Sequence, residues 1–236
     1  MKKRIWELDA LRGICILGVM VVHFVFDVTV LYALVDWQLP DSFLFVQRWG
    51  GILFLLLSGI CVNLGSHSVK RGIIVFGAGL LVSAATAGMY FADLATVDII
   101  IYFGALHCLG VCMMLWPIFR KLPWPVLFAI GAVLIVSGAY LAICPPVNHP
   151  YFMPFGLPWS GFQTADYFPL LPYLGFFLMG AVLGKTLYKN KISLLPMVNE
   201  KALPIRFLCA CGKHSLWIYL LHQPILNGIC WLMASK

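Results

Sequence analysis

The chain has 236 residues, of which 62% are hydrophobic and only 11% are charged, and its formal net charge at pH 7 is +7. A soluble domain typically carries about 25% charged residues, so a water-soluble globule could not cover this much apolar surface. Disorder is excluded as well, because disordered segments combine low hydrophobicity with high charge. The composition therefore predicts an all-α, polytopic membrane protein.

Seven apolar stretches are long enough to cross the membrane, since a spanning helix needs about 20 mostly apolar residues. None alternates with a period of two, which favours helices over a β-barrel. We expect spans over residues 10–34, 42–64, 72–91, 98–116, 124–144, 168–187 and 207–233. The sequence shows no internal repeat, so we expect residues 1–236 to form a single transmembrane domain.

The positive charge is distributed asymmetrically over the loops. With seven spans, all Lys and Arg residues except Arg48 and Lys236 fall on one side of the membrane. Cytoplasmic loops accumulate Lys and Arg, so the sequence predicts a multi-pass protein of the inner cell membrane, with the N-terminus cytoplasmic and the C-terminus outside. A fringe of this kind meets anionic lipid headgroups, a role that we favour over binding to nucleic acid.

Four ionisable side chains lie at intermediate depths of predicted spans, where they are costly and usually functional: His23, Asp27, His107 and His222. Asp27 follows His23 by four residues on the same helix face, so its carboxylate would fix the imidazole tautomer, as a general base requires. The alternative is that each histidine only joins two helices through a hydrogen bond. For any one histidine, we favour this structural role and a functional role equally. For all three histidines together, we favour a functional role.

The eight cysteines do not indicate a metal site. Most lie within spans, where a thiol behaves as a small apolar group. Cys108 and Cys112 are one helical turn apart, but no second pair has the spacing of zinc ligands. We expect neither a metal ion nor a disulfide.

Charged residues also gather at the predicted cytoplasmic edge. Asp9 and Arg12 are three residues apart on the first helix and either form an ion pair or join a phosphate-binding rim with Lys70, Arg71 and Lys213. On the outer side, Arg48 begins the second span, and Tyr151 and Trp159 belong to an aromatic loop. That loop suits stacking on a sugar ring and an interfacial aromatic belt equally well.

Small residues interrupt two apolar runs. Ser58 and Gly59 lie within the second span, and Gly180 and Gly184 form a small-xxx-small pattern in the sixth. We expect both to serve close helix packing rather than chemistry.

Two segments, Arg4–Gly13 followed by His23 and Asp27, and Gly212–Pro224, resemble the bacterial DUF1624 family. That family is related to the lysosomal heparan-alpha-glucosaminide N-acetyltransferase and to the wider transmembrane acyltransferase superfamily. Three less specific segments, 53–59, 103–107 and 169–175, extend the resemblance over nearly the whole chain. This chain differs from the lysosomal enzyme at two places. His23 stands where that enzyme has an asparagine, and residues 28–48 contain no histidine to match its catalytic histidine.

The resemblance implies an integral-membrane acyltransferase that moves an acyl group, acetyl in the simplest case, from cytoplasmic acetyl-CoA to an extracytoplasmic sugar. In this hypothesis His23 is the base, Asp27 orients it, and His107 and His222 hold the oxyanion or the acceptor. The residues expected to bind CoA phosphates are Asp9, Arg12, Lys70, Arg71 and Lys213; those expected to bind the acceptor are Arg48, Tyr151 and Trp159.

A small-molecule or proton-coupled transporter is the alternative, because intramembrane histidines and carboxylates also suit proton relays. Transporters usually show repeat symmetry, which this sequence lacks. The acceptor, the acyl chain length, O- versus N-acylation and a homodimer are left open.

Overall fold

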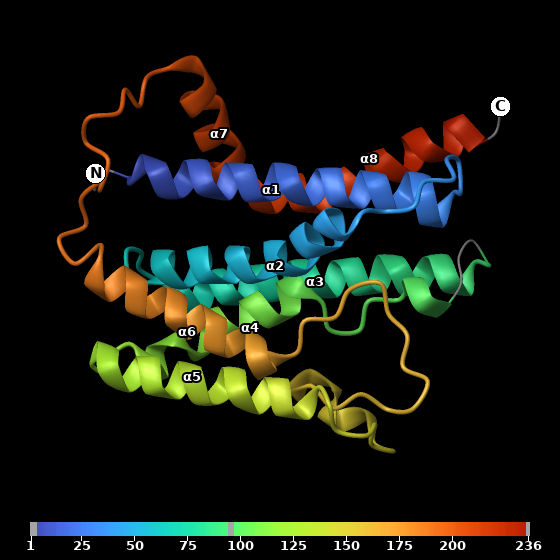
Figure 1. Ribbon diagram of the computed structural model, residues 1–236, viewed down its shortest axis with the longest axis horizontal. Coiled ribbons are helices and arrows are strands. Elements are labelled where there is room, and N and C mark those ends of the chain that lie inside the picture. Colours follow the sequence, from blue (N-terminus) through green and yellow to red (C-terminus); the bar gives the residue numbers. More distant parts are fainter. Residues whose placement is uncertain (1–3, 94–96, 235–236) are drawn as a thin grey trace. The chain divides into compact units, whose positions relative to one another are not determined.

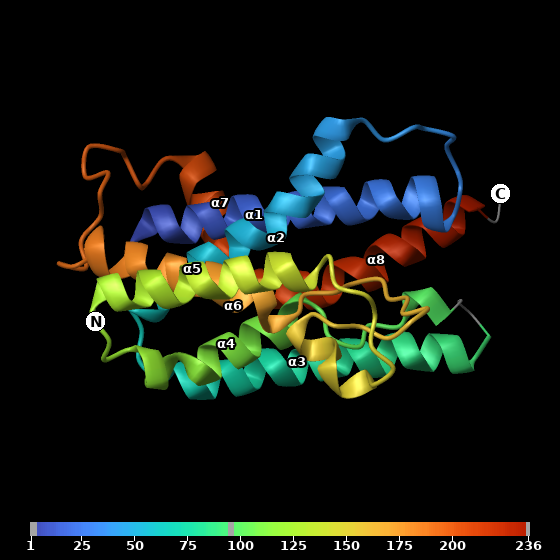
Figure 2. The ribbon, with the colours of Figure 1, turned by 60° about the horizontal axis from the view of Figure 1, so that its bottom comes forward.

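Helices account for almost all regular structure in the computed structural model, which describes residues 4–93 and 97–234 (Figures 1 and 2). The side chains of Ser42, Leu44, Arg48 and Val97 are outside this description. Within these ranges the β contacts amount to one isolated bridge, between Phe103 and Tyr167. The prediction of an all-α fold is confirmed. The chain divides into two compact units, Met1–Phe54 with Asn190–Lys236, and Leu55–Lys189.

The first unit is built around the N-terminal helix. Its elements are α1 (Trp6–Phe26), a π-helix (Asp27–Leu31), the first part of α2 (Asp41–Val62), α7 (Leu203–Lys213) and α8 (Ser215–Ala234). Both α7 and α8 pack on α1, as Figure 1 shows. The predicted last span, 207–233, is therefore two helices, because the polar residues around His214 end α7 before α8 begins.

Two glycines bring α7 against α1. A Cβ atom at Gly212 would overlap the backbone carbonyl of Asp9, and one at Gly13 would overlap the carbonyl of Leu208. The absence of side chains at both positions lets the two backbones touch. The short helix α7 therefore packs closely on the beginning of α1.

The second unit consists of two helix pairs. Its elements are the last part of α2, α3 (Ser68–Phe91), a 3₁₀ turn (Val97–Ile99), α4 (Ala105–Phe119), α5 (Trp124–Leu141), a second 3₁₀ turn (Pro150–Phe155) and α6 (Leu170–Thr186). Helix α3 pairs with α4, and α5 pairs with α6. The long connection between α5 and α6 returns to the segment before α4, where the Thr164 hydroxyl donates to the carbonyl of Ile100 at 2.7 Å (Figure 2).

Small residues also join α2 to α6 within this unit. A Cβ at Gly59 would overlap the carbonyl of Phe177, and one at Gly180 would overlap the carbonyl of Leu56. The Asn63 amide donates to the carbonyl of Ala181 at 3.0 Å. The predicted close packing at Gly59 and Gly180 is confirmed.

Five helical segments are long and apolar enough to cross a membrane among the residues described: Trp6–Leu31, Phe45–Val62, Ser68–Phe91, Trp124–Leu141 and Ser215–Ala234. Two shorter apolar helices, Ala105–Phe119 and Leu170–Thr186, accompany them. Helix α4 begins later than the predicted span at 98, because a 3₁₀ turn precedes it and Gly104 caps it. A multi-pass membrane protein is supported, while seven spans and the orientation of the termini remain predictions.

Candidate functional site

The two helices α1 and α8 carry a seam of polar side chains in the first unit. Three contacts form it: His23 with His222, Asp27 with Gln223, and Tyr32 with Asn227. The residue numbers rise together along both helices, so α8 runs in the same direction as α1. The structure thereby brings together three of the predicted catalytic residues, His23, Asp27 and His222.

Asp27 contacts α8 rather than its own helix. Its side chain is fully buried, and Nε2 of Gln223 donates to both carboxylate oxygens, at 3.0 and 3.1 Å. Among the described residues no hydrogen bond joins Asp27 to His23, so the contact predicted to orient His23 is not formed. Four-residue spacing puts two side chains on one helix face, but here the carboxylate binds the amide of the neighbouring helix.

A π-helix begins at Asp27, where the backbone N–H of Tyr32 donates to the Asp27 carbonyl at 2.8 Å. Such i→i+5 turns are rare and frequently occur at functional sites. The π-helix is therefore a second indication that Asp27 belongs to a functional site, independent of the contacts of its side chain.

The hydrogen bonds of His222 define its tautomer. The side chain is 4% exposed, and Nδ1 lies 2.6 Å from the carbonyl oxygen of Tyr219. A carbonyl only accepts, so Nδ1 carries the hydrogen and Nε2 carries the lone pair. In the described part of the protein Nε2 is buried without a hydrogen-bond partner. A buried acceptor left in this way costs about 1–3 kcal/mol, which points to a ligand that completes it.

The ring of His23 packs against the ring of His222. The two imidazoles meet edge to face, with ring centroids 5.0 Å apart. His23 is only partly buried, whereas His222 is buried. A neutral His222 in this tautomer accepts a proton but cannot donate to an oxyanion through Nε2.

The second unit uses His107 structurally. The Gly104 N–H donates to Nδ1 at 3.2 Å, which leaves the hydrogen on Nε2, 3.4 Å from the Ser83 hydroxyl. Ser83 in turn donates to the carbonyl of Ile101. With both ring nitrogens occupied and 2% of the side chain exposed, His107 caps the start of α4. The geometry favours the alternative of a structural histidine here.

Asp166 also caps α4, a role that the sequence did not indicate. The backbone N–H of Ala105 donates to its Oδ2 at 2.8 Å, and a Cβ at Gly104 would overlap the same oxygen. Burial raises the pKa of Asp166 to about 6, against a smaller lowering by the hydrogen bond from Ala105. The carboxyl therefore titrates near neutral pH.

This raised pKa predicts a pH-dependent stability. The stabilisation from a protonated Asp166 is complete below pH 3.8, its ordinary pKa, and is lost as the pH rises through about 6. We expect Asp166→Asn, which stays neutral and still accepts from Ala105, to gain Tm relative to the parent between pH 4 and pH 7. One kcal/mol corresponds to roughly 2–4 °C at this size. Parallel Tm profiles of the two proteins in the same detergent would contradict the titration.

The charged residues near the start of α1 pair differently from the prediction. Asp9 forms an ion pair with Arg4, with Nε to Oδ2 at 3.0 Å and Nη2 to Oδ1 at 3.1 Å, rather than with Arg12. Asp9 is therefore occupied and is a poor candidate for donor binding. Arg12 and Lys213 are the neighbours in sequence of Gly13 and Gly212, so both lie beside the close approach of α1 and α7.

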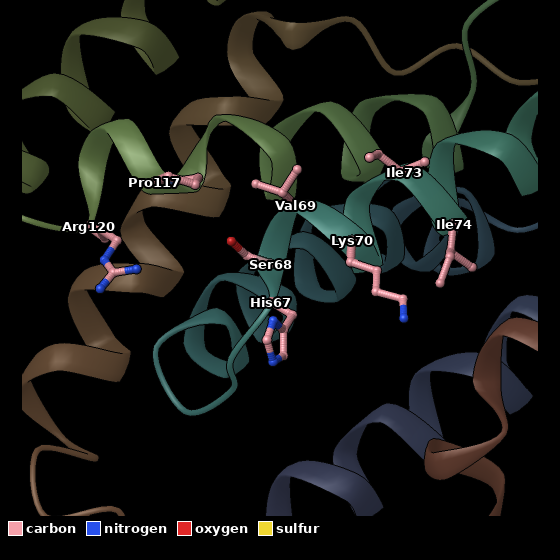
Figure 3. Close-up of a pocket in the computed structure, with 8 residues that line it drawn as sticks. All are labelled: His67, Ser68, Val69, Lys70, Ile73, Ile74, Pro117 and Arg120. Carbon is pink, nitrogen blue, oxygen red and sulfur yellow. The ribbon is translucent and has the colours of Figure 1, made fainter.

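A pocket of about 730 Å³ opens at the beginning of α3 in the second unit (Figure 3). Its lining residues are His67, Ser68, Val69, Lys70, Ile73, Ile74, Pro117 and Arg120. The side chains of His67, Lys70 and Arg120 extend to the same side in Figure 3. The N-terminal end of a helix is also positive, so the pocket suits an anion.

Of the predicted phosphate ligands, Lys70 lines this pocket and Arg71 does not. The Arg71 guanidinium lies instead beside Gly65, over the turn between α2 and α3. Arg120 and His67 are lining residues that sequence reasoning missed as ligands. Arg120 directly follows α4, and the pairing of α3 with α4 brings it to the beginning of α3.

The predicted acceptor residues are not gathered in one place by a described contact. Trp159 packs edge to face on Phe162 and Tyr102, with ring centroids at 4.6 and 5.7 Å. Tyr151 is 81% exposed. The side chain of Arg48 lies outside the described residues, so its predicted role stays a prediction.

No group of three or more His, Cys, Asp or Glu side chains is arranged to hold a metal ion in residues 4–93 and 97–234. The eight cysteines are free thiols. Cys108 and Cys112 face each other with their sulfur atoms 4.0 Å apart.

Comparison with known proteins gives a family. A family model described as heparan-alpha-glucosaminide N-acetyltransferase, catalytic, matches residues 4–224. Neither the curated proteins nor the solved structures gave a match. The matched range covers nearly the whole chain and includes His23, Asp27, His222 and Gln223 of the seam.

Proposed function

The chain belongs to the heparan-alpha-glucosaminide N-acetyltransferase catalytic family, and we propose that it transfers an acetyl group from cytoplasmic acetyl-CoA to an extracytoplasmic sugar. Membership supports a membrane acetyltransferase, and the donor, the acceptor and the direction of transfer are the proposed part. The observation that carries the proposal is the buried, unpartnered lone pair of His222 Nε2 beside His23. A base with a defined tautomer is what acyl transfer to a hydroxyl or amine requires.

In the proposed reaction, the lone pair of the acceptor oxygen or nitrogen forms a bond to the thioester carbonyl carbon while Nε2 of His222 takes the proton. The bond between carbon and sulfur then breaks, and its electron pair stays on sulfur. The proton held at Nε2 passes to the thiolate, which leaves as the CoA thiol. The hydrogen bond from Nδ1 to the Tyr219 carbonyl stabilises the transient imidazolium.

His23 is assigned the complementary role. Its ring nitrogens make no hydrogen bond among the described residues, so a ring N–H is available for the developing oxyanion. The sequence predicted the reverse assignment, with His23 as the base and His222 at the oxyanion. The exchange follows from the tautomer of His222, whose Nε2 can accept but cannot donate.

For the donor, we propose that the phosphates of acetyl-CoA bind in the pocket at the beginning of α3. Lys70 and Arg120 would supply charge-assisted hydrogen bonds to the phosphate oxygens, and Ser68 adds a hydroxyl. This assignment keeps Lys70 from the predicted rim and adds Arg120. Arg12 and Lys213, which belong to the first unit, stay predicted donor ligands.

The decisive experiment supplies purified protein in lipid nanodiscs with acetyl-CoA and a panel of amino sugars and methyl glycosides. We expect acceptor-dependent release of free thiol, together with acetylated product detected by mass spectrometry. A transporter would move solute without thiol release. Thiol release that no acceptor increases would contradict transfer to a sugar.

The donor pocket predicts a specific kinetic defect. We expect Lys70→Gln combined with Arg120→Gln to raise the KM for acetyl-CoA about 10- to 100-fold, because a hydrogen bond to a charged group is worth about 1.5–3 kcal/mol. The KM for the acceptor should not change. Lys189→Gln is the matched control, since Lys189 is exposed and does not line the pocket. An unchanged KM for acetyl-CoA in the double variant would remove the pocket from the mechanism.

A further inference from the structure

A second buried acceptor lies next to His222 on α8. Oε1 of Gln223 is buried and, among the described residues, has no hydrogen-bond partner. Its amide nitrogen donates to the carboxylate of Asp27, with Nε2 3.0 and 3.1 Å from the two oxygens. An ionised carboxylate only accepts, so the NH₂ group must face Asp27 and the oxygen must point elsewhere.

Both unpartnered atoms are identified as hydrogen-bond acceptors, because the neighbouring groups that fix their orientation can only accept hydrogen bonds. The Tyr219 carbonyl fixes the hydrogen of His222 on Nδ1, and the Asp27 carboxylate fixes the NH₂ of Gln223. Each residue leaves one buried acceptor without a partner among the described residues. Whatever completes this part of the seam must bring hydrogen-bond donors.

The two acceptors lie on consecutive residues of the same helix. His222 and Gln223 are consecutive on α8, and the residues that they contact, His23 and Asp27, are one helical turn apart on α1. A ligand group that enters this part of the seam can therefore meet an unpartnered acceptor on each of two consecutive residues. A single hydroxyl can donate to only one of the two acceptor atoms. A primary amine, or a hydroxyl with a neighbouring hydroxyl, can donate to both.

Resting on the acyl transfer proposed above, we propose that Gln223 is a specificity-determining residue that binds a second donor hydrogen of the acceptor, and that Asp27 positions its amide. The reacting hydrogen goes to Nε2 of His222, and the second hydrogen binds Oε1 of Gln223. An acceptor with a single donor hydrogen leaves Oε1 buried and unsatisfied, which lowers its kcat/KM. Asp27 acts through Gln223 and does not touch the substrate.

The test compares matched acceptors with acetyl-CoA as donor in nanodiscs. The probes carry no other hydroxyl: methyl 3,4,6-tri-O-methylglucosaminide against its N-methyl derivative, and methyl 4,6-di-O-methylglucoside against its 2-deoxy form. For the class that is acetylated, we expect the parent protein to prefer the two-donor member by about tenfold in kcat/KM, the value of one substrate hydrogen bond. Gln223→Met should remove this preference, with the KM for acetyl-CoA within about twofold of the parent.

A second variant guards against a simple folding defect. In Asp27→Asn the two amides can pair through both of their groups, so the helix contact is kept and Oε1 of Gln223 is occupied. We expect the preference to disappear in this variant too, although its Tm in the same detergent is retained. A purely structural role for Asp27 and Gln223 would change Tm and leave the ratio of the two acceptors unchanged.

The outcomes separate this inference from the proposed function. If the parent protein does not turn over the thioester, both are overturned. If it does, but either variant keeps the full preference for the two-donor acceptor, the role of Gln223 is overturned and the acetyl transfer stands. Thioester turnover without acetylation of any of the four probes would also overturn the role of Gln223.

Discussion

His222→Asn is expected to lower kcat for acetyl transfer about 10²- to 10⁴-fold, the usual contribution of a general base. An asparagine amide can still donate to the Tyr219 carbonyl in place of Nδ1, so the local structure is kept while the proton-accepting Nε2 is lost. The KM for acetyl-CoA should stay near that of the parent protein, because the change removes no cation. Initial rates of thiol release, measured with saturating acceptor, provide the kcat values.

The same assay with two further variants assigns the roles. His23→Ala should also reduce kcat, through loss of the N–H proposed for the oxyanion, where one donor is worth about 10²–10³. His149→Ala is the control, since His149 is an exposed loop histidine. If His222→Asn keeps the kcat of the parent protein while His23→Ala has a reduced kcat, then His23 is the base, as the sequence alone suggested.

The helical architecture was accessible from the sequence because apolar runs of about 20 residues match the length that a membrane-spanning helix requires. Small residues within those runs were equally informative, and Gly59 and Gly180 do join α2 to α6. The division of the last segment into α7 and α8 was harder to see. The polar residues around His214 end α7, but no local pattern indicates that Gly212 packs on the Asp9 carbonyl and joins α7 to α1.

The candidate site shows which contacts a single sequence cannot supply. The sequence shows that three ionisable residues, His23, Asp27 and His222, lie in apolar spans. It does not show that Asp27 contacts Gln223, which is 196 residues away. Local spacing suggested His23 instead, since it is on the same helix face. His107 is the opposite case, because a residue three positions after the capping Gly104 is well placed to accept its N–H, and that local signal was present in the sequence.

Gly212→Ala should destabilise the protein strongly, because α7 touches α1 at this residue. The added Cβ would overlap the Asp9 carbonyl, which belongs to the backbone of a helix and cannot move aside alone. Overpacking of this kind typically costs about 1–3 kcal/mol or more, against a gain of up to about 1 kcal/mol in helix propensity. We therefore expect a Tm lower by several degrees in detergent, at roughly 2–4 °C for each kcal/mol.

A second measurement connects this loss to α7 itself. Cys209 is buried on α7, and its thiol donates to the carbonyl of Trp6 at 3.3 Å. Displacing α7 from α1 exposes this thiol, so peptide-level mass spectrometry should find faster labelling of Cys209 in Gly212→Ala than in the parent. The matched controls are Gly18→Ala on α1 and Gly228→Ala on α8, where a new Cβ meets no atom within 4 Å.

Both controls should keep or raise Tm, since alanine is the better helix former. Equal Tm shifts in all three variants would mean that glycine propensity, and not the contact of α7 with α1, determines the result. The Gly212 contact also matters for the proposed reaction, because α7 leads directly into α8, which carries His222 and Gln223. If the short helix anchors the start of α8, Gly212→Ala should lower kcat as well as Tm, and assays below the lowered Tm can measure that loss separately.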